Sequence, residues 1–202
     1  MENAKGVVSS PQTSSSVARQ TILFAQNFFR HPRLLGSVVP SSPYLVNQLL
    51  APVDWQRAEV IVEFGPGIGN ITRQVLRRMR PDTTLVAIEL NRAFVNFLQN
   101  DLQDPRFKVV EGSALDVKKI LTQLGLQHAD YIISGIPYTN IPHRLRAGIM
   151  KEAREMIHPE GAMLVYQFTR TVRPYLEESF SSVREDFALW NIFPARTFHC
   201  TP

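Results

Sequence analysis

The sequence predicts an α/β fold: a mostly parallel seven-stranded sheet with helices on both faces and an antiparallel pair of strands closing one edge. Three observations lead to this fold class. Short apolar runs alternate with amphipathic segments, which is the pattern of parallel strands joined by helices. A glycine-rich turn follows the first run, and two extended runs follow one another near the end. With 202 residues, 44% of them hydrophobic, the chain is long enough for one compact domain.

The chain ahead of the predicted sheet divides into a tail and a helical segment. Residues 1–15 are rich in Ser, Gln and Thr and predict a flexible tail. Residues 16–57 predict amphipathic helices, one over Val17–Arg30 and a short one that begins after Ser42. Residues 58–202 then form the α/β domain.

Five predicted strands alternate with helices from residue 60 onward. The strands are Val60–Phe64, Thr84–Leu90, Phe107–Val110, Tyr131–Ser134 and Gly161–Phe168. The helices between them are Asn70–Arg80, Ala93–Asp101, Val117–Leu124 and His143–Ile157. A last helix over Pro174–Val183 leads into two extended runs, Arg184–Ile192 and Ala195–Cys200, which predict an antiparallel hairpin.

Charge and cysteine content narrow the class of protein. The formal net charge is +4, and residues 3–53 hold basic residues but no acidic one, which favours an anionic partner. Cys200 is the single cysteine, so intramolecular disulfides are excluded and a reducing cytoplasm fits. No apolar run approaches the ~20 residues that span a bilayer. No secretory signal is visible, and the histidines lack the spacing of a metal site.

The glycine-rich turn predicts a cofactor site. Residues 62–70 read V-E-F-G-P-G-I-G-N, between a strand and a helix, and glycines let such a turn approach a ligand closely. The glycine spacing differs from the dinucleotide fingerprint, and the turn lacks the Lys-Ser/Thr of a phosphate-binding loop. Glu89 ends the next strand, 20 residues beyond Gly69, where a carboxylate can bind the two hydroxyls of a ribose.

Together with G-S-A-L-D at residues 112–116, this turn resembles the class I S-adenosylmethionine-dependent methyltransferases, which have a Rossmann-like sheet with an antiparallel closing strand. The resemblance covers residues 58–200 and implies S-adenosyl-L-methionine as cofactor and S-adenosylhomocysteine as product. In that resemblance Glu63 faces the methionine amino group, Glu89 takes the ribose hydroxyls and residues 113–116 border the adenine. The cofactor-binding residues it implies are Glu63, Gly65, Gly67, Gly69, Glu89, Leu90, Ser113, Ala114, Asp116 and Ser134.

The loop after the fourth strand, S-G-I-P-Y at Ser134–Tyr138, is expected to face the reacting methyl group, because ligands sit beyond the carboxyl ends of parallel strands. We call it the acceptor loop. It is similar to the N-L-P-Y loop of ribosomal RNA adenine dimethylases, but Gly135 stands where those enzymes carry an Asn that accepts from the target amino group. With the segments around residues 28–42 and 190–196, it is more similar to the bacterial phospholipid N-methyltransferases. This resemblance implies stepwise methylation of phosphatidylethanolamine at the inner face of the membrane.

Side chains on the acceptor side are expected to orient an amine or hold a phosphate. Tyr138 is the first candidate to orient the amine, Tyr44 is a second, and His143 is a candidate to take a proton or bind the lipid phosphate. Further candidates are Tyr166 for the amine and Arg144, Arg146 and Arg170 for the phosphate. Residues 17–33 combine phenylalanines with arginines, which predicts reversible contact with an anionic or zwitterionic membrane surface, or a lid over the cofactor.

Three other functions compete with a phospholipid N-methyltransferase. The first is an RNA adenine dimethylase, with RNA as the partner, against which Gly135 argues. The second is a methyltransferase that acts on a soluble small molecule, with residues 17–33 as a lid. The third is a cofactor-binding or membrane-binding protein without catalysis, which the intact glycine loop argues against.

Overall fold

The computed structural model describes residues 42–188 and 194–202. The predicted tail over residues 1–15, the helix over Val17–Arg30 and most of the segment around residues 190–196 therefore lie outside the described residues. The predicted short helix after Ser42 is confirmed as α2 (Pro43–Leu50), because the Ser42 hydroxyl accepts from the Leu45 N–H at 3.1 Å and caps its first turn.

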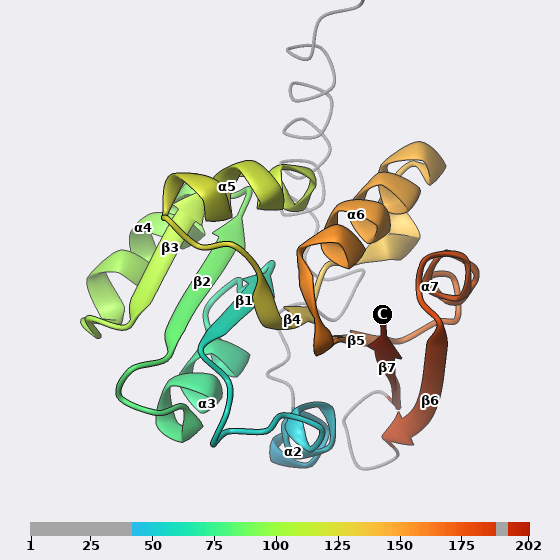
Figure 1. The fold of residues 1–202 in the computed structure, drawn as a ribbon, viewed down its shortest axis with the longest axis horizontal. Helices are drawn as coiled ribbons and strands as arrows, with labels where there is room; N and C mark the ends of the chain where they lie inside the picture. The colour runs from blue at the N-terminus through green and yellow to red at the C-terminus, as the bar shows by residue number, and fades with distance from the viewer. Residues whose placement is uncertain (1–41, 189–193) are drawn as a thin grey trace, which may run out of the picture.

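The predicted sheet is confirmed, with its antiparallel closing hairpin (Figure 1). Its strands are β1 (Val60–Phe64), β2 (Thr84–Glu89), β3 (Phe107–Glu111), β4 (Ala129–Ser134), β5 (Ile157–Gln167), β6 (Ser182–Ala188) and β7 (Ala195–Thr201). Within the described residues they form one seven-stranded sheet in the order β3-β2-β1-β4-β5-β7-β6. The first five are parallel, and β7 runs antiparallel to both β5 and β6.

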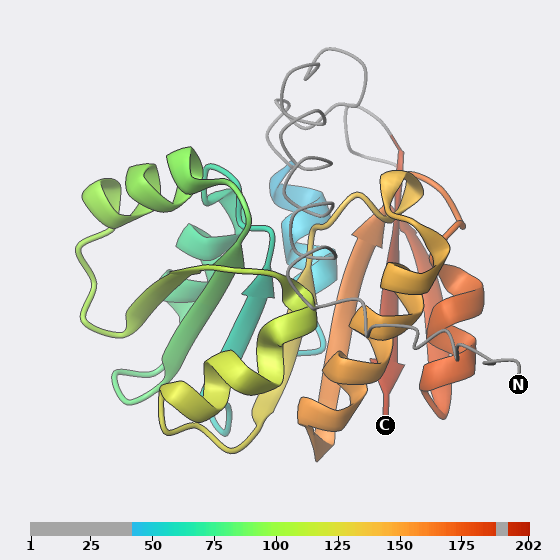
Figure 2. The same ribbon diagram turned by 90° about the horizontal axis from the view of Figure 1, so that it is seen from above.

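Helices cover both faces of the sheet (Figure 2). One face carries α2, α3 (Asn70–Arg78) and α4 (Arg92–Asp101), and the other carries α5 (Val117–Gln123), α6 (His143–Met156) and α7 (Arg173–Ser179). Two short 3-10 turns, η2 (Ala114–Asp116) and η3 (Tyr138–Asn140), follow β3 and β4 at the carboxyl edge of the sheet.

The core consists of two apolar layers, one on each face. Phe64, Ile132 and Met150 belong to the layer under α5, α6 and α7. Leu49 and Val75 belong to the layer under α2 and α3. Since burial of each such side chain contributes about 1.5–3 kcal/mol, the sheet forms a rigid frame that holds the loops at its edges.

Two elements differ most from their predicted bounds. The last helix ends at Ser179 rather than at residue 183, because Phe180 adopts an extended backbone and β6 begins two residues later. Strand β5 begins at Ile157, four residues earlier than predicted, and its pairing with β4 shifts register before Gly161. A Cβ at Gly161 would lie 2.3 Å from the Asp130 carbonyl oxygen, so the irregularity requires glycine.

Candidate active site

The loops that follow β1 to β4 are joined to one another at the carboxyl edge of the sheet. The Gly112 N–H donates to the Glu89 carbonyl at 2.9 Å, and the Gly135 N–H donates to the Phe64 carbonyl at 3.0 Å. The strand order reverses between β1 and β4, and ligands of open α/β sheets bind in the crevice outside such a point. The glycine loop and the acceptor loop lie side by side at this edge, where a Cβ at Gly65 would lie 3.3 Å from Ile136 Cγ1.

The glycine loop has a backbone that side chains rarely adopt. Gly65, Gly67 and Gly69 all have positive φ, at 70°, 57° and 82°. The Glu89 carboxylate accepts from the Gly67 N–H at 3.1 Å and from the Asn91 N–H at 2.9 Å, so it holds the loop against β2. A Cβ at Gly67 would meet no atom within 4 Å. This open space above the loop fits a cofactor that lies along the backbone.

Glu63 is a buried carboxyl group at the base of the glycine loop. The Thr72 hydroxyl donates to its Oε2 at 2.7 Å. Burial raises the pKa of Glu63 to about 7, the Thr72 hydrogen bond opposes that rise, and the negative charge of Glu89 adds to it. Among residues 42–188 and 194–202 no cationic side chain pairs with this carboxyl group, and such a group fits the ammonium of a methionine moiety. Thr72 was not predicted as a site residue, and its only signal is its position in the helix after the loop.

The residues expected to border the adenine lie along the same edge, after β2 and β3. The Ser113 hydroxyl accepts from the Leu115 N–H at 3.2 Å and caps η2. Ala114 is buried, Leu90 is half-buried and Asp116 is exposed. Their contact with the adenine stays a prediction.

The acceptor loop is fixed from inside the core. Tyr138 is 0% exposed and packs in the layer under α6 and α7, and its hydroxyl lies 2.8 Å from the Ser134 hydroxyl. Burial raises the pKa of Tyr138, so the phenol stays neutral. Direct contact of Tyr138 with an amine, and of Ser134 with the cofactor, stay predictions. In the described structure the pair positions the loop.

Two neighbouring residues at the end of β5 contact the acceptor loop. A Cβ at Gly135 would lie 2.9 Å from Cε1 and 3.1 Å from the hydroxyl oxygen of Tyr166, so that ring fills the space beside Gly135. The Gln167 Nε2 donates to the Ile136 carbonyl at 2.7 Å. Sequence reasoning did not assign Gln167 to the site, although a glutamine at the end of a buried apolar strand is a signal for a polar contact.

The three residues predicted to orient the amine or to take its proton do not lie together in the structure; they are Tyr138, Tyr44 and His143. Tyr44 is 47% exposed and lines a pocket of about 480 Å³ together with Arg184 and His199, on the sheet face that carries α2. His143 is exposed at the start of α6, on the other face, with its ring edge-on to Tyr175 at a centroid distance of 4.9 Å.

The three arginines predicted as phosphate ligands differ in the contacts that they already make within the protein. Arg146 donates to the Ile141 and Thr139 carbonyls and lies over the Tyr175 ring, so its charge serves the packing of α6. Arg144 is exposed on α6. Arg170 follows β5 and contacts Glu185.

The sheet order, the glycine loop and the paired acidic residues define a class I S-adenosylmethionine-dependent methyltransferase. The chain belongs to the ribosomal RNA adenine dimethylase family, whose family model matches residues 25–185. S-adenosylmethionine is therefore the cofactor.

Two curated relatives match over different lengths. An ornithine lipid N-methyltransferase from Singulisphaera acidiphila is 29% identical over 180 residues, which cover 88% of this chain and 94% of that protein. A ribosomal RNA small subunit methyltransferase A from Campylobacter hominis is 28% identical over 120 residues, which cover 57% of this chain and 37% of that protein.

Solved structures show the same fold. An O-methyltransferase from Bacillus cereus in complex with SAH has a TM-score of 0.65 at 16% identity and covers 95% of this chain and 92% of its own. A precorrin-6y C5,15-methyltransferase from Geobacter metallireducens has a TM-score of 0.63 at 15% identity and covers 77% and 86%.

Cofactor binding is expected to tighten as the pH rises through about 7. The free protein holds Glu63 protonated below its raised pKa of about 7, while a cationic ammonium favours the carboxylate. Affinity should therefore rise about tenfold from pH 5.5 to pH 7.5, with release of a proton on binding. Calorimetry in two buffers of different ionisation enthalpy measures both effects. Glu63→Gln should bind more weakly and without this pH dependence; a wild-type affinity that is flat across the range would contradict the role of Glu63.

Proposed function

We propose that this protein is a lipid N-methyltransferase that transfers methyl groups to the amine of a membrane lipid, with phosphatidylethanolamine as its acceptor. The contact between Gly135 and Tyr166 carries this proposal. A family member that accepts adenine uses an Asn at this place in the acceptor loop, and here the Tyr166 ring occupies the space beside Gly135 and would have to shift to admit that side chain. The acceptor loop therefore favours an amine other than the amino group of adenine.

The extent of the matches supports the same proposal. The lipid-modifying relative aligns over nearly its whole length, whereas the alignment to the RNA-modifying relative covers 37% of that protein. The first relative is an ornithine lipid N-methyltransferase, so its methyl acceptor is a nitrogen of a lipid. An amino lipid is thus the substrate class that both the relative and the loop favour.

The chemistry requires a neutral amine next to the methyl donor. When bound, S-adenosylmethionine supplies a methyl group on a sulfonium, and the amine nitrogen forms the new C–N bond as the C–S bond breaks. An alkyl ammonium has a pKa of about 10 and no lone pair, so the site must bind the amine without its proton or accept that proton. The buried frame of the acceptor loop favours the neutral form by excluding water, and it orients the nitrogen in line.

Contact with the membrane surface is part of the proposal. Among the described residues, no helix has the length and apolar character that crossing a bilayer demands. Residues 17–33 lie outside the described residues, and their phenylalanines and arginines are proposed to provide reversible attachment.

The test is methyl transfer from labelled S-adenosylmethionine to vesicles that contain phosphatidylethanolamine, with ornithine lipid vesicles and naked ribosomal RNA in parallel tubes. We expect label in phosphatidylethanolamine, and mass analysis then counts the methyl groups. Label in ornithine lipid alone would identify that lipid, and not phosphatidylethanolamine, as the acceptor. Label in RNA alone would overturn the proposal and favour the RNA adenine dimethylase that the family model also suggests.

Tyr138→Phe is expected to separate positioning from direct contact with the amine. The variant keeps the buried ring and leaves the Ser134 hydroxyl without its partner, which should lower the free energy of unfolding by about 1 kcal/mol. Because the loop then moves more freely, we expect turnover to fall about tenfold with unchanged cofactor affinity. Turnover equal to the wild type would exclude any role for the hydroxyl. Tyr138→Ala is unsuited to this question, since a cavity of that size costs about 3–5 kcal/mol.

A further inference from the structure

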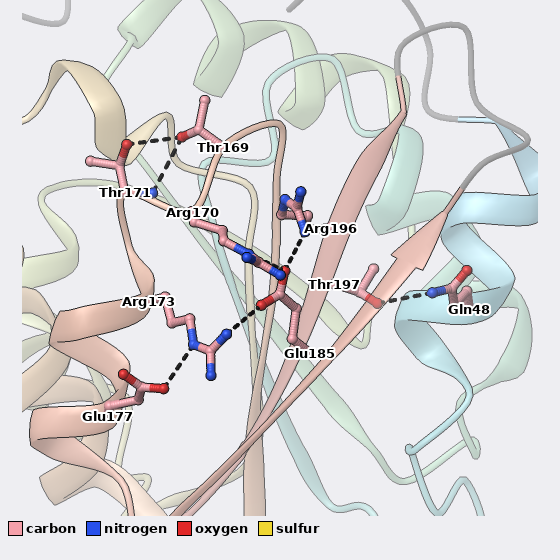
Figure 3. Close-up of polar contacts among 9 residues, drawn as sticks. All are labelled: Gln48, Thr169, Arg170, Thr171, Arg173, Glu177, Glu185, Arg196 and Thr197. Carbon is pink, nitrogen blue, oxygen red and sulfur yellow. Dashed lines mark hydrogen bonds and ion pairs between the residues drawn. The ribbon is translucent and has the colours of Figure 1, made fainter.

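Three arginines surround one carboxylate near the end of β5 and the start of β7, with the carboxylate on β6 (Figure 3). Arg170 Nε donates to Glu185 Oε1 at 2.9 Å, Arg196 NH1 donates to the same oxygen at 2.5 Å, and Arg173 NH1 donates to Oε2 at 2.9 Å. We call these four residues the arginine cluster. The Glu185 side chain is only 12% exposed, so it is the fixed centre around which the guanidinium groups gather.

The arginine cluster keeps an excess of positive charge. Burial raises the pKa of Glu185, but hydrogen bonds from Arg170 and Arg196 lower it by more, so the carboxylate stays ionised at neutral pH. Arg173 also donates to Glu177 at 2.7 Å, and three guanidiniums against two carboxylates leave one positive charge. The largely buried Glu185 carboxylate needs a cationic partner, but one guanidinium is enough to neutralise it, so pairing alone does not explain why three cations gather here.

Two of these guanidiniums have N–H donors that make no hydrogen bond within residues 42–188 and 194–202. Arg170, whose side chain is 61% exposed, contacts Glu185 through Nε alone among those residues. Arg196 contacts Glu185 through one terminal nitrogen. A guanidinium presents five N–H donors in a planar fork that matches the oxygens of a phosphate or carboxylate. Arg173 pairs with two carboxylates, Glu177 and Glu185, so we assign it a structural role in the cluster.

The cluster lies next to the acceptor loop. Ser134 of β4 pairs with Val165 of β5, and Gln167 of β5 pairs with Arg196 of β7. Two strand spacings, about 10 Å, therefore separate the backbones of the loop and of Arg196. Gln167 also bonds the loop directly through Ile136, so both are held on one frame. An arginine side chain and a lipid headgroup together span this distance.

Apolar side chains flank the charged groups. Phe187 is 44% exposed, and the Arg196 guanidinium carbon lies 5.0 Å from its ring centroid. Phe168, 43% exposed, precedes Arg170 by two residues at the end of β5. One net positive charge between two exposed rings fits one oxyanion attached to an apolar chain. RNA binding instead neutralises many phosphates, commonly about 6–10, along an extended basic surface.

We propose that Arg170 and Arg196, held in place by Glu185, bind the oxyanion of the acceptor headgroup and so place its amine over the acceptor loop. This inference rests on the proposed function, that the acceptor is an amino lipid. The shared chemistry is a headgroup that joins an amine to an anion: the phosphate of phosphatidylethanolamine or the carboxylate of an amino-acid lipid.

The test compares Arg170→Gln and Arg196→Gln with Arg57→Gln. Arg57 is also a paired arginine, with a side chain that is 75% exposed, but it precedes β1 at the opposite edge of the sheet and contacts Glu160. Vesicles carry phosphatidylethanolamine, ornithine lipid, or a diacyl lipid with a primary amine and no anion. We expect both cluster variants to raise KM for the acceptor that the wild type uses at least tenfold, with unchanged cofactor affinity by calorimetry. They should also lose the wild-type preference for that acceptor over the anion-free amine.

The possible outcomes separate the two proposals. Wild-type transfer to lipid with unchanged KM and preference in both variants overturns the anion site and leaves the lipid function standing. Absence of wild-type transfer to all three lipids overturns the proposed function and the anion site together. Inhibition of the wild type by millimolar inorganic phosphate, lost in Arg170→Gln, supports the anion site without reference to lipid. A KM effect in Arg57→Gln equal to that of the cluster variants would assign the change to general surface charge and overturn the site.

Discussion

Gly67→Val is expected to abolish binding of S-adenosylmethionine, with an affinity at least 100-fold below the wild type. Gly67 has a φ of 57°, and its Cβ position opens onto empty space beside the Glu89 carboxylate. A valine there fills the volume that a cofactor must occupy. It also strains the backbone that presents the Gly67 N–H to Glu89, at a cost of about 1–3 kcal/mol. Calorimetry measures the affinity, and the shift of the melting temperature on adding cofactor checks it.

Gly125→Val is the matched control for that experiment. Gly125 has a φ of 75°, and its Cβ position also meets no atom within 4 Å, but it follows α5 at the opposite edge of the sheet. Both substitutions therefore carry the same backbone strain without a clash. We expect Gly125→Val to lose comparable stability and to bind the cofactor normally. If Gly67→Val bound the cofactor normally, the cofactor would not lie at the glycine loop.

Gly135→Asn is expected to reduce methyl transfer to lipid at least 100-fold while cofactor affinity stays within about threefold. The new Cβ would overlap the Tyr166 ring at 2.9 Å, and the rest of the side chain would push that ring out of its place beside the acceptor loop. Initial rates with phosphatidylethanolamine vesicles and calorimetry with the cofactor separate the two effects.

A second glycine tests whether any overlap in the core has the same result. A Cβ at Gly148 on α6 would lie 2.8 Å from Leu115 Cδ2, in the segment expected to border the adenine and not against Tyr166. Gly148→Asn should lower the melting temperature and weaken cofactor binding, but at saturating cofactor it should keep the turnover of the folded fraction. If Gly135→Asn retained wild-type turnover on lipid, Tyr166 would have no part in acceptor selection. A gain of RNA methylation by Gly135→Asn would mean that this one position separates the two acceptor classes.

Local patterns were enough to predict the parallel part of the sheet. Val60–Phe64 was predicted to the residue because an apolar run meets a glycine turn there. The start of β5 was missed because His158-Pro159-Glu160-Gly161 has the composition of a turn, while the structure keeps these residues in the strand and absorbs them as a register shift against β4. Pairing with a neighbouring strand overrode local preference.

The contacts within the candidate site depend on residues that are distant in the sequence. Gly67 and Glu89 were predicted as cofactor-binding residues; the structure joins them by a hydrogen bond, and their contact with the cofactor stays a prediction. The contact of Tyr166 with Gly135 joins residues from neighbouring strands, and alternation along β5 gives no sign of it. The approach of Arg196 to Glu185 requires the strand pairing of β6 with β7, which sequence reasoning predicted only as a hairpin without register.

The position of β7 inside the sheet has a consequence for the order of folding. Because β7 lies between β5 and β6, β6 has no partner in the sheet until the strand that follows it in sequence is in place. We expect the β6–β7 hairpin, whose contacts are local, to form first and then dock on β5 as a unit. Glu185 and Arg196 belong to that hairpin, whereas Arg170 follows β5 in the sequence. A nascent or partly unfolded chain would thus assemble its glycine loop before its arginine cluster, and so its proposed cofactor site before its proposed acceptor site.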